Sequence, residues 1–331
     1  MPPARSTPRG RSPARTPDTD SPALPSLFVS QVPKTVTVTE SSSRDGLQSL
    51  GVFVPTSAKV SLIDDLAATG LRYFDAVSFV SPKVVPQMAD ASEVMAAVTR
   101  TPGLKLGGLV PNLKGLESAL AAGVDEIGVL TAASDTFNQR NINATTEEAM
   151  GRIEDIIGQT PDTIGVRGYI STATHCPYEG IIDPGRVAEL AETLAGWGVD
   201  GVYLGETLGK ATPPDVERLL DAVLARVPKE SVGVHFHDTY GQAIANTVIA
   251  LERGIDKMDS SAGGLGGCPF APGAAGNVAT EDLLWLLDGM GIGHGVDGAA
   301  VADVAYRFCN DHNLAYNSKA GRALLAAKGE M

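Results

Sequence analysis

Residues 233–253, GVHFHDTYGQAIANTVIALER, decide the fold class. Residues 233–237 form a short run with Val and Phe that suits a buried strand, and residues 242–253 place apolar side chains at helical spacing. A strand followed at once by an amphipathic helix is the repeating unit of a parallel α/β sheet. We therefore expect the same unit elsewhere in the chain.

The unit recurs from Lys34 onward, and eight strand candidates can be counted. The strands are predicted at residues 35–39, 73–77, 105–109, 126–130, 164–170, 201–204, 233–237 and 257–260. Helical stretches follow them, for example at 57–69, 113–122, 184–196, 213–226 and 242–253. Eight units close a barrel, whereas a doubly wound sheet usually has fewer strands. We predict an α/β fold, a (β/α)8 TIM barrel over residues 34–295, with a C-terminal helical extension at 296–331 packed on it.

The charge distribution excludes two classes of partner. The formal net charge is −13, and residues 1–34 hold five basic groups against Asp18 and Asp20, or +3, which leaves −16 for the rest. Such an acidic body argues against nucleic acid and against anionic membrane surfaces. No apolar run reaches the ~18 residues that a membrane span requires. An anionic small-molecule substrate has to be met by a local basic patch or by a metal.

Residues 1–33 are rich in Pro, Arg, Ser and Thr and lack apolar periodicity, so we predict a disordered extension. The arginines before Asp18 suit a transit peptide, but the prolines among them oppose an amphipathic helix. Three widely spread cysteines argue against a disulfide framework. We expect a cytoplasmic protein, with a mitochondrial location as the alternative if residues 1–33 are a transit peptide.

Polar residues gather where the predicted strands end, which is the catalytic face of a TIM barrel. His235 and His237 are two apart on one strand, so both side chains leave the same face and can reach one ion. Asp45 follows the first strand, which we expect to lie beside the seventh across the closed barrel. Two imidazoles and a carboxylate suit Mg, Mn or Zn, and residue types do not choose among these. Further polar residues at strand ends are Arg44, Asp75 and Glu206.

These residues also have ordinary structural interpretations. Two His residues at i and i+2 are often a satisfied polar pair, and the Asp-Gly pair at Asp45 is common in turns. Arg44 could pair with a surface acid, although beside a metal its guanidinium could stabilise an oxyanion or enolate. Asn277 could cap the helix expected after it, or reach the metal from behind the eighth strand.

Residues 263–277 read GGLGGCPFAPGAAGN, a composition that indicates a mobile or closely approached backbone. We predict an active-site loop. It lacks the Lys and the strand-to-helix context of a P-loop, and it is no dinucleotide fingerprint. A Gly-rich loop does not bury a thiol among apolar side chains, so we predict that Cys268 is a reactive acid/base thiol. We predict structural roles for Cys176 and Cys309.

From about residue 36 to 287 the chain resembles hydroxymethylglutaryl-CoA lyases. The matching stretches are RDGLQ (44–48), SFVSPKVVPQMAD (78–90), PNLKG (111–115), VRGY (166–169), CPYEG (176–180), HFHDTYGQ (235–242) and GLGGCPFA (264–271). The RDG and paired-His elements are shared with other metal-dependent aldol-type lyases and with Claisen synthases. The stretch around Cys268 discriminates between them.

The resemblance implies a homodimer that cleaves (S)-3-hydroxy-3-methylglutaryl-CoA to acetyl-CoA and acetoacetate with a divalent metal. The implied ligands of Mg or Mn are Asp45, His235, His237 and Asn277. Arg44 would stabilise the enolate, and Cys268 would act as acid/base. His235 or Asp45 would remove the hydroxyl proton. Contacts to the CoA moiety are implied for Asn112 and Lys114, and Tyr169 would line the acyl pocket.

The chain departs from the family pattern in several places. Residues 41–43 are Ser-Ser-Ser where Val-Gly-Pro is usual, and Ser49-Leu50 replaces a usual Asn-Glu. Asp75 stands where Glu is usual and Glu206 where Asp is usual. The exchange either moves each acid by about an ångström, which costs on the order of a hundredfold at a reacting centre, or the two changes compensate each other. Both bear on the acyl substrate more than on the reaction type.

Three other functions compete with this interpretation. The first is a lyase of the same mechanism for a longer branched 3-hydroxyglutaryl-CoA. The second is an acyl-CoA condensing synthase, which the absence of room for a regulatory domain before Met331 disfavours. The third is a catalytically silent barrel, which predicts no stoichiometric metal and no thioester cleavage.

Overall fold

Eight parallel strands form a closed barrel in the order β1-β10-β9-β8-β5-β4-β3-β2 in a computed structural model that describes residues 32–267 and 276–329. Their bounds are β1 Thr37–Glu40, β2 Tyr73–Ser78, β3 Lys105–Leu109, β4 Glu126–Ala132, β5 Gly165–Ser171, β8 Gly201–Glu206, β9 Val232–Phe236 and β10 Lys257–Ser260. A two-stranded antiparallel pair, β6 His175–Cys176 and β7 Gly180–Ile181, lies outside the barrel sheet. The predicted TIM barrel is confirmed.

The barrel closes where the first strand pairs with the last. Val38 lies beside Met258 and Thr39 beside Asp259 in this parallel register. The first strand begins later than predicted, because Thr35 makes only an isolated bridge to Gly293. The carboxyl ends of β1 and of its neighbours therefore meet at one mouth of the barrel, where catalytic residues of this fold lie.

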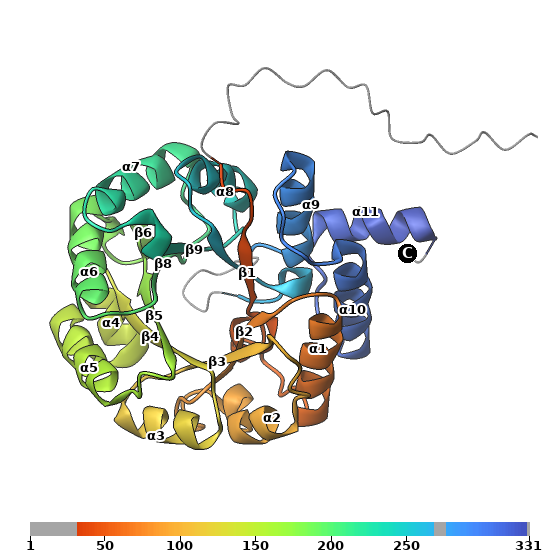
Figure 1. Cartoon of the computed structure of the whole chain (residues 1–331), viewed down its shortest axis with the longest axis horizontal. Helices are drawn as coiled ribbons and strands as arrows, with labels where there is room; N and C mark the ends of the chain where they lie inside the picture. Colours follow the sequence, from red (N-terminus) through yellow and green to blue (C-terminus); the bar gives the residue numbers. More distant parts are fainter. Residues whose placement is uncertain (1–31, 268–275, 330–331) are drawn as a thin grey trace, which may run out of the picture. The chain divides into compact units, whose positions relative to one another are not determined.

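An outer ring of helices surrounds the strands (Figure 1). Their bounds are α1 Thr56–Ala68, α2 Ala91–Ala97, α3 Leu113–Ala121, α4 Asp135–Ile142, α5 Thr146–Gln159, α6 Pro184–Gly196, α7 Pro213–Leu224, α8 Ala243–Glu252 and α9 Thr280–Met290. Shorter turns are η1 Ser42–Gly46, η2 Pro86–Met88, η3 Lys229–Ser231 and η4 Ala262–Gly264. Local signals fix several helix starts; for example, Asp183 caps α6 and Pro184 occupies its first turn.

Two further helices follow the barrel, α10 Gly298–Asp311 and α11 Lys319–Lys328. The buried face of α10 includes Val301, Ala305 and Phe308, and this helix contacts α1, α9 and α11. The predicted C-terminal helices are therefore present against the barrel, whereas the division at residue 295 stays a prediction. Residues 1–31 of the predicted extension, and Cys268, lie outside the described residues.

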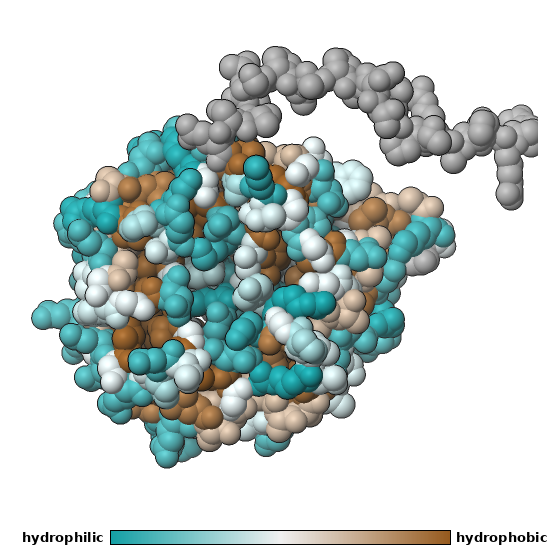
Figure 2. All heavy atoms as spheres, in the orientation of Figure 1, coloured by the Kyte–Doolittle hydropathy of each residue, from teal (hydrophilic) through white to brown (hydrophobic). Residues whose placement is uncertain are grey.

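Figure 2 shows hydrophilic side chains over much of the rim of the visible face, with hydrophobic residues between them. Within the part of the chain that the structure describes, no helix combines the length and the apolar character needed to cross a membrane.

Candidate active site

The turn η1 carries Arg44 and Asp45 directly behind the end of β1. It is a π-helical turn, a rare conformation that is frequent at functional sites. Ser41, at its start, donates from its backbone N–H and from its hydroxyl to the Ser260 carbonyl, at 2.8 and 2.9 Å. The backbone bond ties the start of the turn to β10, and the hydroxyl adds a second bond to the same carbonyl.

Asp45 faces both imidazoles of the predicted histidine pair. Its Oδ2 lies 3.7 Å from His235 Nε2 and 3.8 Å from His237 Nε2. One potential ligand atom from each of the three residues lies within 4.8 Å of the others. His235 and His237 are buried, and Asp45 is nearly so. The structure thus brings together three of the four predicted metal ligands through nitrogen and oxygen atoms that can share one cation.

The spacing and the chemistry of this trio fit a divalent cation. Two ligands that each lie about 2.1 Å from one ion are about 3 to 4 Å apart, and the two distances from Asp45 fall in this range. A carboxylate with two imidazoles suits several divalent metals. The residues present are therefore consistent with a metal site, and they do not select the metal.

Asn277, the fourth predicted ligand, already contacts this trio. Its amide nitrogen donates to Asp45 Oδ2 at 2.8 Å and to the Leu265 carbonyl at 3.2 Å. An amide binds a cation through its oxygen, so Asn277 would ligate only after its amide group turns over. Its backbone also forms an isolated antiparallel bridge with His237.

Two expectations about the strands need correction. The first and seventh barrel strands are not neighbours, because β10 lies between β1 and β9. His237 lies just past the end of β9 rather than within it, where it bridges Asn277. Both imidazoles nevertheless face Asp45, since the intervening strand is short and η1 reaches across its end.

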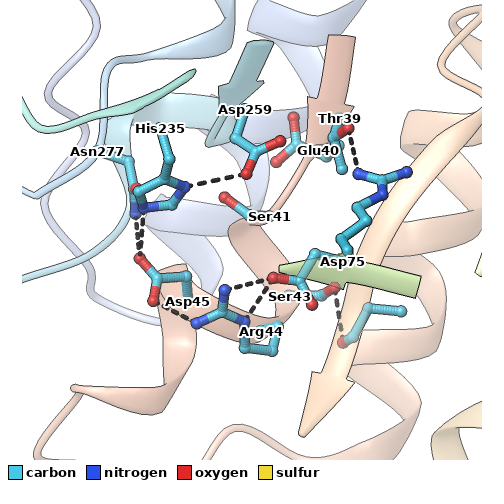
Figure 3. Close-up of polar contacts among 12 residues, drawn as sticks. Thr39, Glu40, Ser41, Ser43, Arg44, Asp45, Asp75, His235, Asp259 and Asn277 are labelled. Atoms are coloured by element: carbon cyan, nitrogen blue, oxygen red, sulfur yellow. Dashed lines mark hydrogen bonds and ion pairs between the residues drawn. The ribbon is translucent and has the colours of Figure 1, made fainter. Parts of the chain in front are cut away.

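Arg44 is held between two carboxylates (Figure 3). Its Nε donates to Asp75 Oδ2 at 2.6 Å, its Nη2 pairs with the same oxygen, and its Nη1 pairs with Asp45 Oδ1. The side chain is buried, with 6% exposed. The interpretation of Arg44 as a residue paired with a surface acid is therefore wrong, because both partners lie inside the barrel mouth.

The charges of the cluster set the protonation states of its members. Burial alone would raise the pKa of Asp45, but Arg44 and the two imidazoles hold it well below its usual range. Burial alone would lower the pKa of His235, but the hydrogen bond to Asp259 and the charge of Asp45 raise it. Burial and repulsion from His235 lower the pKa of His237 to about 4. Asp45 is thus ionised and His237 neutral near pH 7, the forms that bind metals.

A cavity of about 140 Å³ opens beside the trio. Arg44, Asp45, His235 and His237 form part of its wall. Tyr169 of β5, which the resemblance assigns to the acyl pocket, also lines this cavity, and its ring lies edge-on to His235 with centroids 6.2 Å apart. The apolar side chains in the wall are Leu109, Leu130, Phe137 and Ile170. The reactive groups therefore share one small chamber with an apolar side.

Other predicted site residues lie outside this chamber. Glu206 ends β8 and is buried, and its Oε1 accepts from Thr174 at 3.1 Å. Among the described residues, no hydrogen bond or ion pair joins Glu206 to Asp75, so direct contact does not explain how the two exchanged carboxylates would compensate. Asn112 is exposed and caps α3 through Gly115 N–H at 3.0 Å, and Lys114 is exposed on the same helix. The predicted structural cysteines, Cys176 and Cys309, are both buried thiols.

A family model described as HMGL-like matches residues 35–307. The chain belongs to the HMGL-like family.

Relatives of this family match nearly the whole chain. The 3-hydroxy-3-methylglutaryl-CoA lyase, cytoplasmic, of Rattus norvegicus is 46% identical over 310 residues, which is 93% of this chain and 90% of that protein. A hydroxymethylglutaryl-CoA lyase, mitochondrial, of Gallus gallus is 45% identical over 88% of this chain and 98% of that protein. A 3-hydroxy-3-isohexenylglutaryl-CoA/hydroxy-methylglutaryl-CoA lyase of Pseudomonas aeruginosa is 46% identical over 89% of this chain and 99% of that protein.

A solved structure agrees with this likeness. The crystal structure of hydroxymethylglutaryl-CoA lyase from Pseudomonas aeruginosa has a TM-score of 0.87 to this chain at 46% identity, covering 89% of this chain and 99% of that one. This HMGL-like chain therefore shares both sequence and barrel architecture with lyases over most of its length.

Close backbone approach explains the glycines that flank residues 268–275 in this HMGL-like chain. A Cβ added to Gly276 would lie 2.5 Å from the Gly266 carbonyl carbon, and one added to Gly266 would lie 2.7 Å from the side-chain nitrogen Nδ2 of Asn277. Gly267, which immediately precedes Cys268, lines the same cavity as Arg44 and Asp45. The prediction of a closely approached backbone is confirmed at both ends of this segment.

Sequence reasoning missed Asp259 of β10. Its Oδ2 lies 3.1 Å from His235 Nδ1, and only 3% of the residue is exposed. A carboxylate inside a short strand between Met258 and Ser260 is unusual, because a buried charge requires a partner. The position of Asp259 within a predicted strand was visible in the sequence, but its pairing with His235 was not.

Proposed function

We propose that this protein is a divalent-metal-dependent carbon–carbon lyase that cleaves (S)-3-hydroxy-3-methylglutaryl-CoA to acetyl-CoA and acetoacetate. One observation carries the proposal: Asp45, His235 and His237 converge on one point beside Arg44 in a single chamber. Relatives that are named as lyases of this substrate match about nine-tenths of the chain. Mg or Mn is the proposed metal.

The residues of the chamber have complementary roles in this reaction. A divalent cation held by Asp45, His235 and His237, with Asn277 as a further ligand, would act as a Lewis acid toward the substrate's hydroxyl and carboxylate oxygens. His235 and Asp45 are the two candidate bases. With Nε2 on the cation and Nδ1 bonded to Asp259, His235 would accept the proton only by leaving the cation, whereas Asp45 would keep a second carboxylate oxygen.

The bond changes balance with these groups alone. The C3 hydroxyl proton passes to the base, the C3–O bond becomes the ketone of acetoacetate, and the C2–C3 bond breaks. Its electron pair forms the enolate of acetyl-CoA, whose negative oxygen the Arg44 guanidinium in the cavity wall would stabilise. A proton delivered to C2 completes acetyl-CoA, and Cys268 is the proposed donor. The position of Gly267 in the cavity wall supports that role for its neighbour.

The test is the release of acetoacetate from hydroxymethylglutaryl-CoA, with Mg or Mn present and after chelation. We expect turnover only with metal, and a loss of at least about a thousandfold in His235→Ala. His312→Ala serves as the matched control, because His312 lies against Phe308 at the end of α10 and does not line the chamber. Turnover that survives both chelation and His235→Ala would contradict the proposal, and so would a protein that binds no metal.

A longer branched acyl group is the second candidate substrate. The relative from Pseudomonas aeruginosa is named for both a 3-hydroxy-3-isohexenylglutaryl-CoA and a hydroxy-methylglutaryl-CoA, and it is as similar to this chain as the rat enzyme. The apolar wall at Leu109, Leu130 and Phe137 suits a larger alkyl group. Comparing kcat/KM for the two thioesters decides between them. A Leu130→Ala variant should shift the ratio toward the longer one.

Asn112 and Lys114 are the proposed contacts to the CoA moiety. Both follow the end of β3, whose last residue, Leu109, lines the chamber, and both residues are exposed. A cationic Lys114 would meet the phosphates of CoA. Lys114→Ala should raise KM for the thioester severalfold and leave kcat nearly unchanged. An unchanged KM would remove Lys114 from the proposal.

We also propose a homodimer in the cytoplasm. Trp285 of α9 is 62% exposed beside an apolar groove of about 650 Å³ between α8, α9 and α11. A two-fold contact would place the tryptophan of each copy against the groove of the other. Its relatives include forms named cytoplasmic and mitochondrial, so the location rests on the proline-rich composition of residues 1–33. Fractionation of cells that express the full chain tests it.

A further inference from the structure

The second barrel strand contains one residue without a partner in the third. Asp75 pairs with Gly107 and Val77 with Gly108, so Ala76 between them forms a β-bulge. Bulges are rare in parallel sheets, and next to active sites they often redirect a side chain. Here the bulge directly follows Asp75, the residue that holds Arg44.

A buried serine hydroxyl binds this bulge. Ser43 Oγ donates to the Ala76 carbonyl at 3.0 Å, and the serine has only 2% of its surface exposed. Ser43 belongs to η1 and immediately precedes Arg44. One hydrogen bond therefore links the turn that carries the guanidinium to the bulge that carries its partner (Figure 3).

The position of Asp75 determines where the guanidinium lies. A single oxygen, Asp75 Oδ2, accepts from both Nε and Nη2 of Arg44. The aspartate side chain is short, so the backbone at the bulge sets how far this oxygen can reach. A shift of the bulge would move Arg44 relative to the chamber, although Asp45 would still hold its Nη1.

We propose that Ser43 is a positioning residue for Arg44. Its hydroxyl holds the bulge at Ala76, and the bulge directs Asp75 toward the guanidinium that stabilises the enolate. The inference rests on the proposed function, because it concerns the group that acts on the enolate. It adds a residue that is not part of the chamber wall.

Ser43→Ala tests the inference, with Ser41→Ala as the matched control. Both serines are buried in the same turn and donate a hydroxyl bond to a carbonyl of a neighbouring strand, at 3.0 and 2.9 Å. Ser41 also keeps its backbone bond to Ser260. We expect kcat of Ser43→Ala to fall about ten- to a hundredfold, with KM and metal affinity within about twofold of the wild type. Ser41→Ala should stay within about threefold in kcat.

A double-mutant cycle separates positioning from a merely structural role. In an Arg44→Lys background the guanidinium is already absent, so Ser43→Ala should then lower kcat by less than about twofold. A structural role would give the same further loss in both backgrounds. If Ser43→Ala does not fold, Ser43→Cys preserves the volume with a weaker donor and should show part of the loss.

Each outcome has a distinct meaning. A wild type that releases no acetoacetate contradicts the proposed function. An active wild type in which Ser43→Ala and Ser41→Ala behave alike overturns only the role of Ser43. So does an active wild type in which Ser43→Ala loses the same factor with and without Arg44. A wild-type kcat in a folded Ser43→Cys protein also overturns it.

Discussion

Asp259 Oδ2 lies 3.1 Å from Nδ1 of His235, on the side of the ring opposite the nitrogen that faces Asp45. A carboxylate on one ring nitrogen fixes the orientation and tautomer of a ligating histidine and increases the basicity of the other nitrogen. Asp259 thus supports the proposed metal site from β10, the strand that separates β1 from β9.

Replacing Asp259 should therefore weaken metal binding. We expect Asp259→Asn to lower the affinity for Mg or Mn about ten- to a hundredfold, with activity recovered in part at high metal. Calorimetric titration of the metal-free protein measures this. Asp288→Asn is the matched control, because Asp288 pairs with His294 at 2.9 Å outside the chamber. Equal affinities in the two variants would rule out the support role.

The paired N–H donors of the Arg44 guanidinium should contribute more to kcat than its positive charge. Arg44→Lys keeps one positive charge but loses the paired contacts of Nε and Nη2 to Asp75. We expect kcat to fall about a hundredfold or more, with KM changed little, as measured by steady-state release of acetoacetate. Arg226→Lys, just past the end of α7 in an ion pair with Glu192 of α6, should be neutral. A wild-type kcat in Arg44→Lys would show that a point charge is enough to stabilise the enolate.

Glu281 should make stability depend on pH. Its carboxylate is 1% exposed, accepts from Gly263 N–H at 3.0 Å and from the Tyr316 hydroxyl at 2.9 Å, and burial raises its pKa from 4.5 to about 7. The folded state therefore holds this proton more tightly than the unfolded chain does. Its contribution to the free energy of unfolding is fully present below about pH 4.5 and is lost as pH rises through 7.

Glu281→Gln should remove this loss. Between pH 4.5 and 7.5, the free energy of unfolding of the variant should rise by up to about 3 kcal/mol relative to that of the wild type. Urea unfolding at a series of pH values measures this difference. Glu230→Gln, at an exposed position in η3, is the control and should follow the wild type. Parallel curves for the wild type and Glu281→Gln would contradict the assignment.

The groove beside Trp285 should hold the proposed dimer together. We expect Trp285→Glu to convert dimer to monomer, because a carboxylate would have to be buried without a partner in the contact. Light scattering after size exclusion measures the mass. Val84→Glu, at another exposed apolar position, should remain dimeric. A monomeric wild type, or a dimeric Trp285→Glu, would remove this face from consideration.

Local patterns were enough to predict the barrel. The bounds of β3, β10 and α6 agree with those expected, because Lys105–Leu109 and Lys257–Ser260 are short runs between turns and Pro184 marks a helix start. Short or irregular elements were missed. The pair β6–β7 has only two residues in each strand, and the helix α4 lies between a strand and another helix.

Contacts between distant segments limited the prediction of the site. The strand pattern placed Asp45 and the two histidines at one mouth, but it put β1 beside β9 and thereby missed Asp259. The role of Asp75 toward Arg44 depends on a bulge that no sequence period reveals. The roles of Asn112 and Lys114 remain predictions, since their proposed partner is the substrate. The role of Cys268 remains a prediction because this residue lies outside the described residues.

The hydrogen bond between Asn277 and Asp45 joins positions that are 232 residues apart. Almost the whole barrel must fold before these two side chains meet, and contacts at such sequence separation form slowly during folding. A nascent chain that lacks its last strand therefore has no complete chamber. If the proposed cation binds, it would stabilise only the complete barrel and would not stabilise partially folded forms.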